Sequence, residues 1–315
     1  MSSRKEIQSI INELIESNNS FSPGLLHFFS DINSTDLKEI QSIWEKIPLN
    51  RRIQLLTDLE NLLEVDTLVN FDDLGKFALS DPDMQVRCQA IHLLWENDET
   101  STSRILCDLL GNDPHEQVCA AAAYALGRFV LLGELEEIPR KYFDEVESLL
   151  LQTYHNNKSQ LVRRKALEAI GYSSKPEVKR VIMHAIENTD PIWLTSALIT
   201  MGRSANQDWE VQIKQHLSSP FFSVREEAIR AAGELELEGT RTILLGFLEN
   251  EDTQDECWPT IIWALSQIGG EGVREKFEQL LEQALSEDEI EVIEMAIENL
   301  VFTEADNTFD IFNIG

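Results

Sequence analysis

The stretch PFFSVREEAIRAAGEL, residues 220–235, decides the fold. Its apolar residues Val224, Ala228, Ile229 and Ala232 stand at i, i+4, i+5 and i+8. That spacing places them on one side of an α-helix, because about 3.6 residues complete a turn. The stretch therefore predicts an amphipathic helix that buries this side against other helices.

The same pattern returns along the chain, each time around an alanine. The residue after the alanine and the residue four places on are apolar in every unit. Self-similarity at intervals of about 20 to 50 residues is typical of repeat proteins. The seven alanines, which are 31 to 44 residues apart, are Ala90, Ala122, Ala166, Ala197, Ala228, Ala264 and Ala296.

A second run of periodic apolar residues separates each alanine-centred (inner) helix from the next, so each unit is predicted to be an antiparallel helix pair. The small alanine lets a neighbouring pair approach closely. Stacked pairs form a superhelix, and the predicted fold class is therefore an all-α solenoid. The second (outer) runs span residues 104–110, 141–155, 177–187, 209–217, 240–248 and 273–285.

Start and stop signals accompany the inner helices. A capping oxygen followed by proline favours a helix start, and a glycine that accepts a positive φ favours a helix end. The predicted starts are Asp81-Pro82, Asp113-Pro114, Asp190-Pro191 and Ser219-Pro220. The predicted end glycines, five residues after the alanine, are Gly127, Gly171, Gly202, Gly233 and Gly269.

These units resemble the HEAT-repeat family, especially the short HEAT-like repeats related to phycobilisome-lyase repeats. The resemblance rests on DPDMQVRCQAIHLL (residues 81–94), KSQLVRRKALEAIG (residues 158–171) and residues 220–235. It implies that a turn aspartate and an arginine six residues later form a ladder between neighbouring units. Asp81 and Arg87 fit that ladder fully, whereas other units fit it partly or lack it.

Three regions are predicted. Residues 1–80 are expected to be an N-terminal helical cap with degenerate repeats, although a separate small helical domain is an alternative. Residues 81–302 form the HEAT-like array, and residues 303–315 form an acidic tail. The apolar tail residues, which either fold back on the last repeat or bind a partner, are Phe309, Ile311 and Phe312.

The charge of the chain is −30 and is unevenly distributed. Residues 205–315 hold 25 acidic and 6 basic side chains, whereas residues 128–180 hold 10 basic and 8 acidic ones. Nucleic-acid binding depends on Lys and Arg that neutralise phosphates, so no nucleic-acid partner is expected. The acidic C-terminal half favours a basic protein or peptide partner.

No stretch approaches the roughly 20 apolar residues that a membrane helix needs, and the N-terminus lacks the apolar centre of a signal peptide. We therefore expect a soluble protein of the cytoplasm, with no membrane partner. The four cysteines show no CxxC spacing and are expected to be buried free thiols.

No catalytic residue, metal ligand or cofactor site is predicted. Deoxyhypusine hydroxylase, a repeat protein of this kind, holds two irons on several His-Glu pairs, but the single His-Glu dipeptide here is His115-Glu116. The predicted function is a non-enzymatic interaction scaffold. The alternative is an auxiliary subunit of a lyase-like or protein-modifying enzyme complex.

Three positions of each inner helix, five before, two after and six after the alanine, lie opposite its apolar side. We expect them to line a concave groove. Aromatic and arginine side chains anchor protein interfaces. The predicted partner-binding residues are Tyr124, Tyr172, Ile199 and Arg230, with Trp263 beside them. The alternative is that loops or the N-terminal segment cover these residues.

Overall fold

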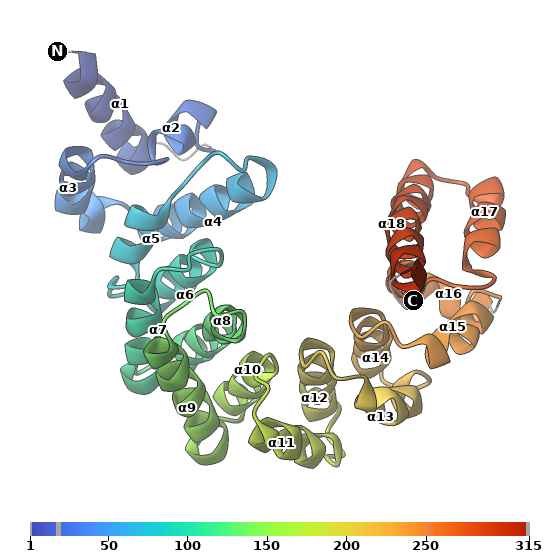
Figure 1. Cartoon of the computed structure of the whole chain (residues 1–315). Helices are drawn as coiled ribbons and strands as arrows, with labels where there is room; N and C mark the ends of the chain where they lie inside the picture. Colours follow the sequence, from blue (N-terminus) through green and yellow to red (C-terminus); the bar gives the residue numbers. More distant parts are fainter. Residues whose placement is uncertain (1, 17–19, 250, 313–315) are drawn as a thin grey trace. The chain divides into compact units, whose positions relative to one another are not determined.

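The computed structural model describes residues 2–16, 20–249 and 251–312, and these form α-helices α1 to α18 with three short 3-10 turns (Figure 1). The chain divides into two compact units, Met1–Ala169 and Ile170–Gly315. Both units are built from helix pairs, and the predicted all-α solenoid is confirmed.

Unit 1 holds a row of inner helices. Helices α4, α6 and α8 pack side by side, and the outer helices α5 and α7 pack on α6 and α8. The helices are α1 (Ser2–Glu16), α2 (Pro23–Phe28), α3 (Ser34–Ile43), α4 (Leu49–Val65), α5 (Asp72–Ala78), α6 (Met84–Leu93), α7 (Thr100–Asn112), α8 (Glu116–Glu134), α9 (Arg140–Asn156) and α10 (Gln160–Ile170).

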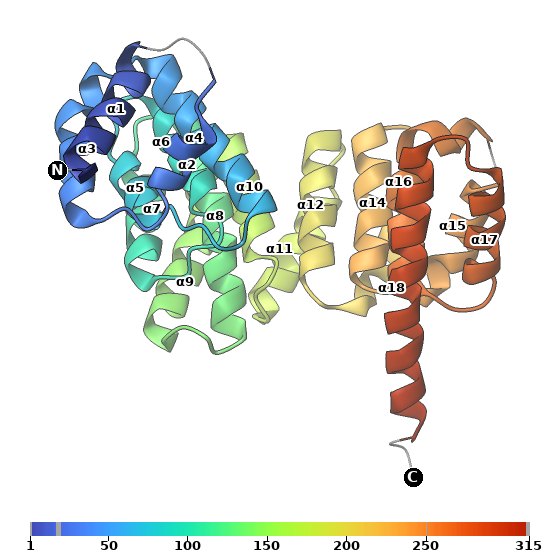
Figure 2. The ribbon, with the colours of Figure 1, turned by 90° about the horizontal axis from the view of Figure 1, so that it is seen from above.

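Unit 2 repeats the arrangement. The inner helices α12, α14, α16 and α18 lie side by side, and each packs against the outer helix that precedes it (Figure 2). The helices are α11 (Pro176–Ile186), α12 (Pro191–Arg203), α13 (Glu210–His216), α14 (Phe222–Glu234), α15 (Arg241–Phe247), α16 (Glu251–Ile268), α17 (Val273–Gln283) and α18 (Glu287–Phe312).

The seven repeat alanines form the centre of this packing. Six of them are fully buried, and Ala296 exposes 5% of its surface. Their neighbours on the same side, such as Val224 and Ile229 of α14, are also fully buried. The predicted buried side of the inner helix is therefore confirmed.

The predicted role of the glycines is wrong in four of the five units. Only Gly269 takes a positive φ, 58°, after the last residue of α16. A Cβ on Gly127 would lie 3.1 Å from Ala169 Cα, and one on Gly233 would lie 2.8 Å from Ala264 Cα. Such a glycine is present because the next inner helix comes too close for a side chain, not because the helix ends there.

One of the four predicted helix starts is confirmed. Asp190 caps α12, where its Oδ1 accepts a hydrogen bond of 2.9 Å from the Ile192 N–H. At Asp81 and Asp113 the predicted start is wrong, because each carboxylate accepts from the N–H two residues on, outside the helix. These bonds form Asx turns, and α6 and α8 begin two residues after the prolines. At Ser219-Pro220 the start is also late, at Phe222.

The predicted region boundaries, 1–80, 81–302 and 303–315, stay predictions. Helix α4 packs against α6 as α6 packs against α8, so a repeat-like inner helix lies within the first 80 residues. The backbone of α18 is helical through Phe312, and the side chains of Phe309, Ile311 and Phe312 lie outside the described residues.

Candidate functional site

One face of the inner helices holds exposed side chains such as Ile192, Glu291 and Glu298, whereas Glu168, Ser196 and Ser266 at equivalent positions are buried. It contains the three predicted positions and a fourth, the residue just before the alanine, because Trp263 of α16 and Lys165 of α10 stand there and contact the neighbouring inner helix. We call these four positions together the inner-helix face. The sequence analysis placed Trp263 beside this face, whereas the contacts place it in the face.

Trp263 lies between two inner helices of unit 2. The Arg230 guanidinium of α14 lies 6.0 Å from the centre of the Trp263 ring, within cation–π range. The ring covers the Gly233 backbone, where an added Cβ would lie 2.8 Å from Trp263 Cζ3. Glu227 holds the other side of Arg230, with its Oε1 3.4 Å from Arg230 Nε. The indole is thus fixed in place with 36% of its surface exposed.

A second aromatic pair lies at the opposite side of α12. The Arg203 guanidinium is 5.3 Å from the centre of the Tyr172 ring. Glu234 of α14 links the two pairs: desolvation of its carboxylate, which lies over Gly202 of α12, and the nearby Glu227 raise its pKa, while Arg203 and Arg230 lower it. The structure therefore brings Tyr172, Arg230 and Trp263 into one charged and aromatic cluster.

Two aliphatic residues of α12 also belong to the inner-helix face of unit 2. Ile199, two residues after Ala197, is half-buried. Ile192, five residues before Ala197, exposes 55% of its surface. Tyr124 belongs to unit 1. It exposes 47% of its surface, and Lys165 Nζ lies 5.0 Å from its ring centre. The predicted partner-binding residues thus fall in both units, with four of the five in unit 2.

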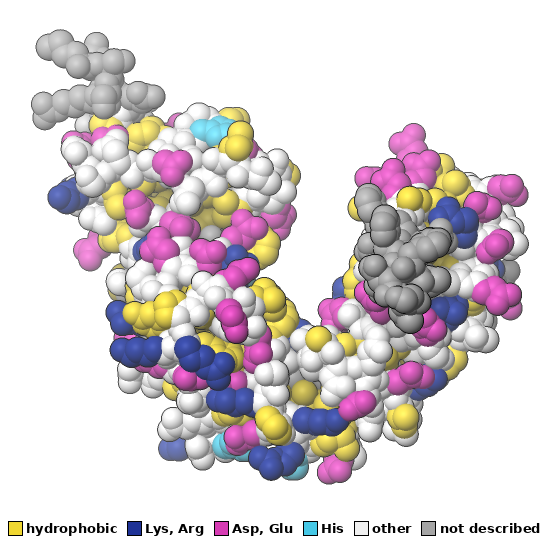
Figure 3. All heavy atoms as spheres, in the orientation of Figure 1, with side chains coloured by type: hydrophobic (Ala, Val, Ile, Leu, Met, Phe, Trp, Pro, Cys, Tyr) yellow, Lys and Arg dark blue, Asp and Glu magenta, His cyan; other side chains and the backbone are white. Residues whose placement is uncertain are grey.

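Three exposed residues of α18 share this face, and only Met295 stands outside the predicted positions. Glu291, Met295 and Glu298 occupy the positions five before, one before and two after Ala296, and all three are exposed. Figure 3 shows the acidic side chains gathered over α17 and α18. Met295 directly precedes the repeat alanine Ala296, so its place in the repeat could be read from the sequence. The position before the alanine was, however, not counted as part of the face.

The charged ladder of unit 1 is a separate feature. Arg87 donates to both carboxylate oxygens of Asp113, at 2.8 and 2.9 Å, and to the Asp81 carbonyl at 2.8 Å. The implied ladder therefore links neighbouring repeats, but the carboxylate that Arg87 contacts belongs to Asp113 rather than to Asp81. The Asp81 carboxylate accepts instead from Arg52, at 2.5 Å, so the ladder reaches back into α4.

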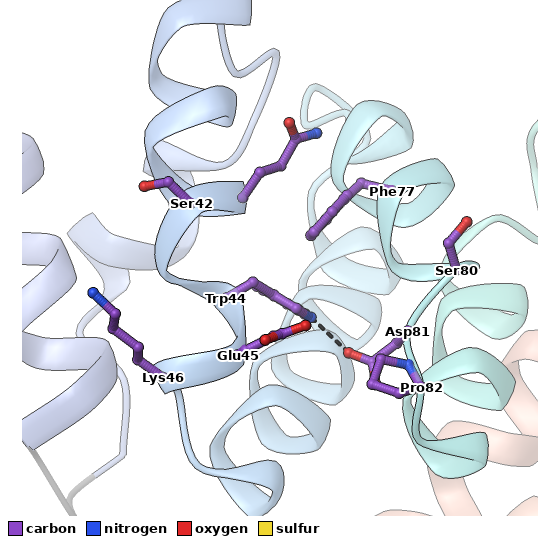
Figure 4. A pocket seen from close by; sticks show the side chains of 9 residues that line it. Ser42, Trp44, Glu45, Lys46, Phe77, Ser80, Asp81 and Pro82 are labelled. Atoms are coloured by element: carbon purple, nitrogen blue, oxygen red, sulfur yellow. Dashed lines mark hydrogen bonds between the residues drawn. The ribbon is translucent and has the colours of Figure 1, made fainter.

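A hollow of about 370 Å³ opens beside this ladder (Figure 4). Trp44 Nε1 donates to the Asp81 carboxylate at 2.6 Å, and the Trp44 ring meets Phe77 edge-on at 5.4 Å. Because the polar atoms of Trp44 and Asp81 bond each other, they hold the wall of the hollow rather than a ligand. We assign this region a structural role.

Groups suited to metal or thiol chemistry are few in the described part of the chain. No group of three or more His, Cys, Asp or Glu side chains there could hold a metal ion. The four cysteines are free thiols, and burial raises the pKa of Cys107 to about 12. Burial also raises the pKa of Cys88 and Cys119, so these thiols stay protonated at neutral pH. Within the described ranges, no helix is long and apolar enough to cross a membrane.

Helix pairs stacked through buried alanines define this protein as an α-solenoid. The profile of the HEAT repeat matches residues 104–132, which form most of α7 and α8, so the predicted resemblance to HEAT repeats is confirmed. No curated protein matches the sequence.

Several solved structures are similar in fold. The X-ray structure of YibA from Escherichia coli is 18% identical, with a TM-score of 0.49, over 90% of this chain and 98% of that one. Importin beta is 12% identical, with a TM-score of 0.46, over 95% of this chain and 47% of that one. Human deoxyhypusine hydroxylase in complex with glycerol is 14% identical, with a TM-score of 0.37, over 96% and 98%.

Proposed function

We propose that this chain is a non-enzymatic, cytoplasmic scaffold that binds a basic protein or peptide on its inner-helix face. The observation that carries the proposal is the cluster of Tyr172, Arg230 and Trp263, in which arginines lie against the half-buried Tyr172 ring and the exposed Trp263 ring. Rigid aromatic and arginine side chains contribute most to binding energy at protein interfaces.

The charge of unit 2 supports the basic character of the partner. Residues 205–315 carry a net charge of −19, and a negative field speeds the association of a positive partner. Unit 1 has a separate pair on its own inner-helix face, in which Lys165 Nζ lies 5.0 Å from the centre of the Tyr124 ring.

Affinity capture with the full-length protein tests the proposal. We expect a basic protein to be captured from native lysate at low salt and released by 0.5 M salt, because exposed charges are screened within a few Å at that ionic strength. Replacing Tyr124, Ile199 and Trp263 together with serine should abolish capture and leave the helical circular dichroism unchanged.

Trp95→Ser is the matched control, because Trp95 exposes 51% of its surface but lies outside the inner-helix face. This variant should capture the partner as well as the wild type does. Equal capture by the triple variant would contradict the proposal. Loss of helicity in the triple variant would also contradict it, because the three side chains would then be core residues.

A further inference from the structure

Helix α18 carries an exposed stripe that its packing does not use. Glu291, Met295 and Glu298 stand at i, i+4 and i+7 and so share one side of the helix. Met295 exposes 64% of its surface. The other side of α18 is buried through Ile293 and Leu300, so the helix does not depend on the stripe for its packing.

The two glutamates of the stripe have no cation beside them. Among the described residues, no Lys, Arg or His lies within ion-pair distance of Glu291 or Glu298. Residues 277–312 contain no Lys or Arg, and the only cationic side chains of α17 are Arg274 and Lys276. Within the described part of the chain, the negative charge of the stripe is therefore not paired with a cation.

Trp263 stands on α16, the helix next to the stripe, and its ring lies against Gly233 and Arg230 of α14. Helices α16 and α18 pack together, and Asn299 Nδ2 donates to Ser266 Oγ at 3.1 Å across the pair. This bond fixes the register, in which Trp263 and Met295 both stand one residue before their repeat alanine. They hold equivalent places on adjacent helices, whose axes pack about 8 to 10 Å apart.

We infer that Trp263, Glu291, Met295 and Glu298, which we call the α16–α18 patch, bind an amphipathic basic helix of the partner. This inference rests on the proposed function and deepens it. Glu291 and Glu298 are separated by about 10.5 Å along the helix axis. A helix laid along α18 matches them with Lys or Arg residues seven positions apart.

The apolar part of the patch defines the rest of the partner helix. An apolar residue three or four positions after the first cation falls between the two glutamates, over Met295. The thioether of methionine is polarisable and adapts to partners of different shape. Trp263 then covers the flank of the docked helix, where an arginine or lysine stem can also pack.

A synthetic peptide tests this inference with the full-length protein. The probe is a fluorescent 18-residue helix of Ala, Leu and Lys, with Lys at i and i+7 and Leu at i+3 and i+4, titrated by anisotropy at low salt. We expect saturable binding, and no binding when Glu replaces the two Lys residues. Glu291→Gln combined with Glu298→Gln should weaken binding at least about tenfold, and Met295→Ser should weaken it by a similar factor.

The matched control is Glu278→Gln combined with Glu282→Gln, which removes the same charge from two exposed positions of α17. This variant should change the dissociation constant less than about twofold. Equal weakening by both double variants would overturn the inference, because the overall charge would then be responsible. Absence of peptide binding, or unchanged binding by the α18 variants, would overturn it as well.

The same variants separate this inference from the proposed function. If the α18 variants still capture the protein partner that the triple serine variant loses, the α16–α18 patch is not the docking site but the scaffold proposal stands. If light scattering shows that wild-type protein self-associates through Met295, a second copy occupies the patch and the inference is overturned.

Discussion

The two units contain the same helix repeat but place their charged side chains differently. In unit 1, the carboxylate of Asp81 is fully buried and bonds Arg52 and Trp44, and Arg87 is bonded to Asp113 in the next repeat. In unit 2, charged and aromatic side chains lie on the surface of the inner helices, around Trp263. The same buried alanines support both arrangements. Buried charges therefore join repeats, whereas exposed charges are available to a partner.

The largest expected effect is in the ladder of unit 1. Asp81→Ala removes the carboxylate that Arg52 and Trp44 share and leaves a buried guanidinium without its anion. Breaking a buried ion pair in this way costs about 3 to 5 kcal/mol. Urea unfolding followed by the fluorescence of Trp44 should show the loss.

The matched control for the ladder is Asp144→Ala, which removes an exposed pair with Arg140 in the same unit. This change should cost less than about 0.5 kcal/mol. If the two variants lose equal stability, burial of the ladder does not distinguish the units.

The second largest loss of stability is expected where the inner helices of unit 2 contact each other. Gly233→Val places a branched side chain against Ala264 and the Trp263 ring, and overpacking of this kind costs about 1 to 3 kcal/mol. Gly246→Ala is the control, because a Cβ there meets nothing within 4 Å. The control should be neutral or stabilising by up to about 1 kcal/mol in a denaturant titration.

A smaller effect is expected in how the stability of each unit depends on pH. The pKa of Glu234 in unit 2 is raised, so the folded state binds a proton more readily than the unfolded state. Stability of unit 2 should therefore increase as the pH falls through the folded pKa toward 4.5, and Glu234→Gln should remove this dependence.

Asp113 in unit 1 has the opposite behaviour. Burial raises the pKa of its carboxyl, but hydrogen bonds from Arg87 and the His115 N–H lower this pKa by more than burial raises it. The pKa of Asp113 is therefore lower than the ordinary value. Its stabilisation is present above pH 3.8 and is lost as the pH falls below that value. Unfolding of each unit, followed by its tryptophan fluorescence from pH 7 to pH 3, checks both directions of the pH dependence of stability. A common pH dependence in the two units would contradict this contrast.

The sequence predicted the repeat and its buried side because the spacing of small and apolar residues is set by the helix itself. It could not predict that Gly127 and Gly233 serve helix contact, because a close approach depends on the neighbouring helix, which a single-helix pattern does not describe. The same reason explains the ladder: Arg87 and Asp113 are 26 residues apart, and only packing brings them together.

The candidate site was predicted in part. A helical wheel identified Tyr172 and Arg230 as surface positions, but it does not show which side of the surface faces the next inner helix. For this reason Trp263 was placed beside the face, and Met295 was missed. Glu234 stands at a predicted position, yet its raised pKa depends on the desolvation of its carboxylate near Gly202 of α12 and on Glu227.

Oxidative footprinting of the full-length protein, with and without the captured partner, tests directly whether the partner binds the α16–α18 patch. Met295, Trp263 and Trp95 are all exposed, and hydroxyl radicals label such side chains. We expect the partner to protect Met295 and Trp263 in unit 2 and to leave Trp95 in unit 1 fully labelled. Protection of Trp95 with unchanged labelling of Met295 and Trp263 would contradict this expectation.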